Sequence, residues 1–135
     1  MRLKKPTGQA LVEFALVVPL LIILIFGIIE FGVLLYDKAV ITNASREGAR
    51  YGIVLRQTRY TKAEIEAVAQ SYCQNHLVTF VGTSVPVANA TFTTQNFGDP
   101  LSVQVSYNYA FLVLPKFLGL GQTLNLQATT VMKYE

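Results

Sequence analysis

The sequence predicts an α+β protein in which a long apolar helix near the N-terminus leads into a second helix and a small antiparallel sheet of about three strands. A predominantly apolar stretch long enough to cross a bilayer lies near the N-terminus, helical spacing of apolar residues follows it, and beyond residue 82 the spacing changes to a period of two. With 135 residues, the chain has room for one compact domain, which excludes a multidomain enzyme.

The first predicted element is a membrane-spanning helix. Residues 14–29 carry no charge, and the apolar stretch continues past Glu30 to residue 36. A helix over residues 14–36 is roughly 34 Å long at about 1.5 Å per residue, enough to cross a hydrocarbon core of about 30 Å. Pro19 removes one backbone donor and is expected to bend or locally break it. A secretory signal peptide is the alternative, but the stretch is too long and lacks a small-x-small cleavage site at its end. An uncleaved anchor, or cleavage before the helix, fits better.

The helix is expected to continue beyond the membrane, because residues 37–55 contain no proline and repeat apolar or small residues at helical spacing. Within this segment Ala44, Gly48 and Gly52 lie four residues apart and form a ridge that allows another backbone to approach closely. The ridge packs either inside the domain or against a neighbouring helix in an assembly.

A second helix is predicted over residues 62–78. Thr61 and Glu64 have the spacing of a capping box at its start. The residues expected on its buried face are Ile65, Val68, Ala69, Tyr72 and His76, with Phe80 as a further candidate.

Alternating apolar and polar residues predict strands over residues 101–111 and 124–134, and a weaker third strand over 85–94. The connection over residues 112–123 is unusually apolar. It either packs over the core or forms a contact surface for a partner or membrane. The residues of this candidate surface are Leu112, Leu114, Phe117 and Leu118.

The charge distribution argues against nucleic-acid binding. The formal charge of +3 first suggests an anionic partner, but Arg2, Lys4 and Lys5 account for all of it. The other 8 basic residues balance the 8 acidic ones, so the chain has no broad basic face. The basic N-terminus instead favours a cytoplasmic location for that end of the chain.

The sequence offers little for catalysis. Cys73 is the single cysteine and His76 the single histidine, so neither a disulfide within the chain nor a multi-cysteine metal site can form. A thiol enzyme that uses this pair is an alternative, but no orienting acid or oxyanion motif accompanies it. No phosphate-binding loop or paired-histidine motif is present. We therefore expect no enzymatic activity, cofactor or metal.

The most informative segment is residues 8–14, GQALVEF, between the basic residues and the apolar stretch. A carboxylate beside so apolar a helix is costly to desolvate, so Glu13 needs a partner or a task. Cleavage after Gly8 would create an α-amine at Gln9 that could neutralise Glu13 of its own or a neighbouring chain. Alternatively, Glu13 extends to the membrane interface.

This arrangement of a basic leader, Gly8, four residues and Glu13-Phe14 resembles the prepilin processing signal of Flp-type (type IVb) pili and their pseudopilins. Within that class, GQALVEFALVVPLL, the later Ile29-Glu30 and NASREGARYG are most similar to the TadE-like family of the tight-adherence pilus system. The similarity covers residues 8 to about 52. The classical prepilin signal instead has Phe after the cleaved Gly and usually a Leu-Ile-Glu core, and this departure favours the tight-adherence branch.

The resemblance implies that a membrane-embedded aspartic prepilin peptidase cuts between Gly8 and Gln9, and that Glu13 and Phe14 serve in recognition or assembly. The other implied partners are pilin or pseudopilin subunits and the inner-membrane assembly platform. The expected organisation is pilin-like: a leader at residues 1–8, a transmembrane helix at 9–36 and an extracytoplasmic α+β head at 37–135.

The expected protein is a single-pass pseudopilin or minor pilin of the bacterial inner membrane, with a cytoplasmic N-terminus and a periplasmic head. It would act in pilus assembly and surface adhesion, without catalytic residues of its own. The alternative is an anchored binding module whose head captures a ligand.

Overall fold

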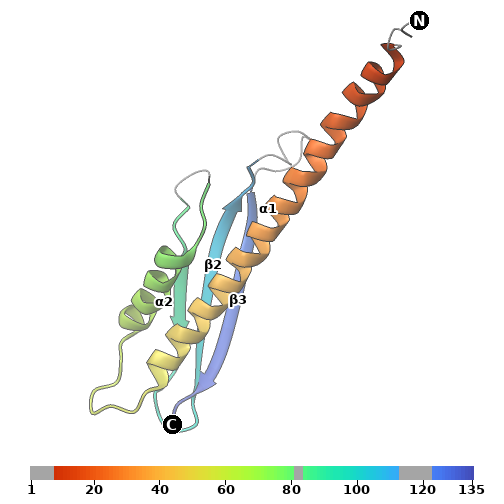
Figure 1. The fold of residues 1–135 in the computed structure, drawn as a ribbon. Helices are drawn as coiled ribbons and strands as arrows, with labels where there is room; N and C mark the ends of the chain where they lie inside the picture. Colours follow the sequence, from red (N-terminus) through yellow and green to blue (C-terminus); the bar gives the residue numbers. More distant parts are fainter. Residues whose placement is uncertain (1–7, 81–83, 113–122) are drawn as a thin grey trace, which may run out of the picture.

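The computed structural model describes residues 8–80, 84–112 and 123–135. The elements are α1 (Gly8–Ile53), α2 (Lys62–His76), β1 (Val87–Thr91), β2 (Pro100–Ala110) and β3 (Thr123–Lys133). Both helices lie on the same face of the sheet, and the N-terminal half of α1 extends well beyond it (Figure 1). The predicted α+β fold, with a long N-terminal helix, a second helix and three antiparallel strands, is confirmed.

Helix α1 is continuous from the apolar stretch into the head. It runs through Pro19 without interruption, so the prediction of a local break is wrong. Proline removes a single backbone donor, and the long helix on either side retains its own hydrogen bonds. Within the described residues, α1 is the one helix long and apolar enough to cross a membrane, and its most apolar window is entirely unburied.

The packing of α1 against the head begins at Glu30, before the boundary expected at residue 37. From there one face of the helix is buried, because its buried residues recur at separations of three, four and seven residues, as expected for a helix resting on a sheet. The buried residues of α1 are Glu30, Asp37, Val40, Ile41, Ala44, Ser45, Gly48, Ala49 and Gly52.

The sheet has the strand order β1-β2-β3, and both strand pairs are antiparallel. Val105 in the central strand pairs with Ala88 on one side and Ala128 on the other. The odd-numbered residues of β2 from 101 to 109 are buried beneath the helices, while the even-numbered ones face outward. A strict period of two therefore places one face of the sheet in the core.

Helix α2 is shorter at its C-terminus than predicted. Leu77 adopts an extended conformation that ends the helix, so the end predicted at residue 78 is wrong by two residues. His76 and Phe80 are exposed, contrary to the predicted buried face, and Cys73 is buried instead. The buried residues of α2 are Ile65, Ala69 and Cys73, and Val68 and Tyr72 are half-buried.

Candidate functional site

The N-terminal segment of α1 projects away from the head. Gly8 is the first described residue of α1, and the Gln9 side-chain amide donates a hydrogen bond to the Glu13 carboxylate over 3.1 Å. Phe14 is exposed beside them. The four residues with predicted roles in processing and assembly therefore lie together on the first two turns of one exposed helix.

Glycine is not required at position 8 by the fold. A Cβ atom placed there would have no atom of the described residues within 4 Å, and the Gly8 backbone is not in the left-handed region that favours glycine. By contrast, a Cβ on Gly52 would lie 2.5 Å from the Leu101 side chain. Close packing in the head therefore explains the glycine at position 52 but not the glycine at position 8.

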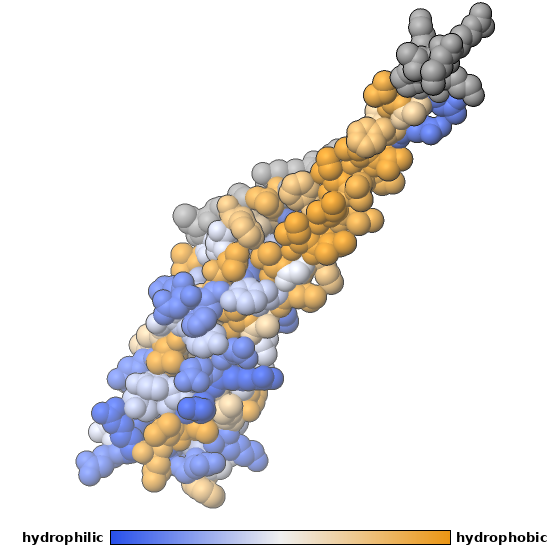
Figure 2. Space-filling model, viewed as in Figure 1, coloured by the Kyte–Doolittle hydropathy of each residue, from blue (hydrophilic) through white to orange (hydrophobic). Residues whose placement is uncertain are grey.

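An apolar belt surrounds α1 from residue 11 to residue 29. None of these residues is buried, and Figure 2 shows a continuous hydrophobic surface along the visible face of the projecting helix. The large side chains of this belt are Leu11, Val12, Phe14, Leu16, Val17, Leu20, Leu21, Ile22, Leu24, Ile25, Phe26, Ile28 and Ile29. A helix that is hydrophobic on all sides requires a lipid or protein environment.

The outer face of α1 stays apolar where the opposite face already contacts the head. Phe31, Leu35 and Tyr36 are about half exposed, while Val33 and Leu34 pack against the core. Among the described residues of α1 beyond Tyr36, the exposed side chains are polar, charged or small. Residues 30–36 therefore present apolar side chains in two directions.

The small-residue ridge lies inside the head. A Cβ on Gly48 would lie 3.1 Å from the Ala69 Cβ and 3.3 Å from a methyl group of Val103. Ala44 and Gly52 are likewise buried in this contact between α1, α2 and β2. The partners of the ridge in the structure are therefore elements of the same chain.

Two buried carboxylates tie α1 to the end of the head from which its apolar N-terminal half projects. The Glu30 carboxylate accepts a hydrogen bond from the Leu112 backbone N–H, and Asp37 accepts one from the Val78 N–H over 3.0 Å. These N–H groups follow the ends of β2 and α2. Since the acids are seven residues apart, they lie on the same face of the helix.

The surroundings of Asp37 disfavour its charged form. Asp37 is fully buried, and no hydrogen-bond partner of its Oδ2 atom is found among the described residues. Burial raises the pKa of Asp37, while the hydrogen bond from Val78 partly opposes that shift. Burial, together with the charges of Glu30 and Asp37, also raises the pKa of Tyr109 to about 12. Glu30 and Asp37 were not predicted as site residues, although the sequence shows that they lie seven residues apart in an apolar helix.

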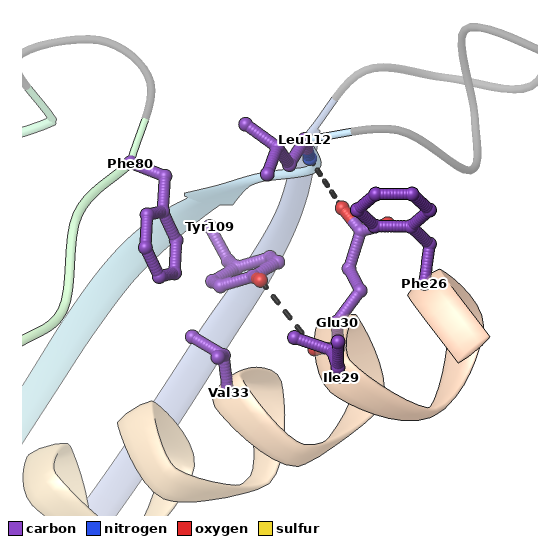
Figure 3. Close-up of a pocket in the computed structure, with 7 residues that line it drawn as sticks. All are labelled: Phe26, Ile29, Glu30, Val33, Phe80, Tyr109 and Leu112. Carbon is purple, nitrogen blue, oxygen red and sulfur yellow. Dashed lines mark hydrogen bonds between the residues drawn. The ribbon is translucent and has the colours of Figure 1, made fainter. Parts of the chain in front are cut away.

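A small apolar cavity of about 110 Å³ lies where α1 meets this end of the head. Its lining residues are Phe26, Ile29, Glu30, Val33, Phe80, Tyr109 and Leu112 (Figure 3). The Tyr109 hydroxyl donates a hydrogen bond of 3.5 Å to the Glu30 backbone carbonyl. Of the predicted partner surface, Leu112 lines this cavity and is partly exposed, whereas Leu114, Phe117 and Leu118 lie outside the described residues.

The Cys73 and His76 pair is not arranged for catalysis. Cys73 is fully buried, and burial raises the pKa of its thiol to about 11. A thiol with so high a pKa is protonated at neutral pH and is a poor nucleophile. The His76 ring is exposed and stacks on Tyr72. Within the described residues, no three His, Cys, Asp or Glu side chains are grouped closely enough to hold a metal ion.

These features fit one class of protein, a single-pass membrane protein in which the apolar helix also forms part of the head's core. A model of the TadE-like protein family matches residues 8–50, which confirms the predicted TadE-like resemblance over this segment. The match covers 43 of the 135 residues, all of them within α1. Comparison with curated proteins and with solved structures gave no match.

Proposed function

We propose that this protein is a pseudopilin or minor pilin that acts in the assembly of the tight-adherence (Flp) pilus and in surface adhesion. The observation that carries this proposal is that α1 presents apolar side chains on two opposite faces at residues 30–36. Phe31, Leu35 and Tyr36 remain exposed where the opposite face packs on the head. This face lies beyond Ile29, where the part of α1 without buried residues ends, so it needs a partner other than the head. Packing against the helices of other subunits gives it a role.

Processing after Gly8 by a prepilin peptidase is the second part of the proposal. Glycine at this position is explained by access of the peptidase to the backbone, because nothing in the described structure requires it. Cleavage leaves the α-amine of Gln9 four residues from Glu13, where one turn of helix brings groups together. That amine is largely protonated at neutral pH and neutralises Glu13 of the same or a neighbouring subunit.

In this proposal the N-terminus lies in the cytoplasm and the head in the periplasm, with the helix in the bacterial inner membrane. The partners are the prepilin peptidase, other pilin or pseudopilin subunits and the assembly platform. The chain itself acts by packing rather than by turnover of a substrate. The buried, protonated Cys73 thiol supports this non-enzymatic role.

Co-expression of the full chain with a cognate prepilin peptidase tests the processing step. N-terminal sequencing should find a protein that begins at Gln9, and Gly8→Val should block the cut. Gly32→Ala is the matched control, because Gly32 lies on the same helix and its Cβ would also meet nothing within 4 Å. Retention of Met1, or a start beyond residue 30, would contradict the proposed processing.

The assembly role is tested with Glu13→Ala in cells that produce the pilus. We expect cleavage to remain measurable and pilus number to fall, because the Gln9 amine loses its partner. Glu47→Ala removes an exposed carboxylate from the head part of the same helix and should leave pilus number unchanged. A normal pilus number in Glu13→Ala would rule out the charge pairing.

A further inference from the structure

We propose that the membrane-proximal end of the head rests on the lipid bilayer, with Phe80 and Leu112 inserted beside the point where α1 leaves the membrane. This inference uses the membrane anchor but goes beyond the proposed role in pilus assembly. The occupant of the surface is the lipid surface itself, at the boundary between acyl chains and headgroups.

The first argument is that these side chains form one surface with the anchor. Phe80 follows α2, Leu112 follows β2, and both line the cavity that Phe26 and Ile29 of α1 also line (Figure 3). Phe80 is 56% exposed and Leu112 is 41% exposed. Large apolar side chains that are exposed singly need no explanation, but a surface continuous with a membrane span does.

The second argument is the level at which the bilayer ends. The apolar belt from residue 11 to residue 29, which contains one charged residue, Glu13, near its start, is about 28 Å long at about 1.5 Å per residue, close to the hydrocarbon thickness of about 30 Å. Glu30 is the first buried residue of α1. A bilayer that covers the belt therefore ends near Ile29, which lines the same cavity as Phe80 and Leu112.

The third argument concerns the polar groups at this end. Among the described residues that line the cavity, Glu30 is the one with a charged side chain, and its carboxylate accepts the Leu112 N–H. The Tyr109 hydroxyl donates to the Glu30 carbonyl. Because these groups are hydrogen-bonded within the chain, the surface meets lipid without leaving them unpaired.

The sequence contains no tryptophan, so a single introduced tryptophan reports on one position. The experiment uses the full chain in vesicles of phosphatidylethanolamine and phosphatidylglycerol, with bromine atoms on the acyl chains near the headgroups. Phe80→Trp is the test variant. Phe97→Trp is the matched control, because Phe97 is 86% exposed and lies near Ile53, about 36 Å along α1 from Ile29.

We expect brominated lipid to quench Phe80→Trp at least twofold more strongly than Phe97→Trp, and acrylamide in the water to quench it less. Leu112→Trp should behave like Phe80→Trp and serves if that variant fails to fold. Equal quenching of test and control would overturn the proposal. So would shielding from both quenchers, which would indicate that protein covers the surface. No peptidase or pilus is present, so the outcome is independent of the proposed function.

Discussion

Replacement of Gly52 by alanine should loosen the contact between the two helices and the sheet. The new Cβ would lie 2.5 Å from Leu101 Cδ2 and 2.7 Å from Ile65 Cδ1, whereas carbon atoms pack at about 3.5–4.0 Å. Both neighbours are fully buried, so each must move by about 1 Å into a packed core. Such overpacking costs about 1–3 kcal/mol, and the higher helix propensity of alanine returns up to about 1 kcal/mol. We expect a net loss of about 1–2 kcal/mol.

The assay for Gly52→Ala is urea unfolding of the full chain in detergent micelles, followed by the fluorescence of its 7 tyrosines. Gly32→Ala is the control, because it makes the same change in the same helix without a neighbour within 4 Å. It should leave the free energy of unfolding unchanged or raise it by up to about 1 kcal/mol. If Gly52→Ala proved as stable as Gly32→Ala, the ridge would not pack against α2 and β2 as described.

Three further predictions concern the head. Thr61→Ala removes the capping box of α2 and should lower the free energy of unfolding by about 1 kcal/mol. Because hydrogen bonds from Thr61 lower the pKa of Glu64, Glu64 stabilises the fold at neutral pH, and this contribution is lost as the pH falls through the lowered pKa. Glu64→Gln removes the titrating carboxyl group, so in urea unfolding experiments its stability should fall less than that of the wild type as the pH is lowered, and an equal fall would contradict this account. In the folded protein, burial raises the pKa of Asp37 above its ordinary value of 3.8. The ionised carboxylate therefore destabilises the fold at pH values above the raised pKa, and this destabilisation disappears as the pH falls below 3.8. The stability of the wild type should therefore improve relative to Asp37→Asn on acidification, and parallel pH curves would refute the assignment. Iodoacetamide should label Cys73 slowly in the folded protein and rapidly in urea, as followed by intact mass, because its buried thiol has a pKa of about 11.

Local patterns were sufficient to predict the strands and the start of α2. The alternation over residues 101–111 and 124–134 predicted β2 and β3 to within about one residue, because each residue that faces the helices must be apolar. The reciprocal hydrogen bonds between Thr61 and Glu64 are present as the sequence predicts. Such features depend on residues that are close together in the chain, so the sequence alone is sufficient to predict them.

Contacts between distant residues could not be predicted in the same way. The helical pattern favoured continuation of α2 to residue 78, but the Val78 N–H donates to Asp37, which lies 41 residues earlier. The burial of Glu30 likewise depends on the Leu112 N–H, 82 residues further along the chain. In the sequence, Glu30 is only a charge within an apolar stretch. Its partner becomes evident once β2 is placed against α1.

The two buried acids, Glu30 and Asp37, also connect α1 to the head at two points. Glu30 holds the chain after β2, Asp37 holds the chain after α2, and α1 continues between and beyond them without a break. A hinge needs a few residues that can absorb changes in backbone angles, and residues 30–53 form one helix packed along the sheet. In the proposed function, an assembly step that lifted or rotated the anchor in the membrane would therefore move the head with it. The position of a neighbouring subunit on the outer face at Phe31, Leu35 and Tyr36 would then fix the orientation of the whole head.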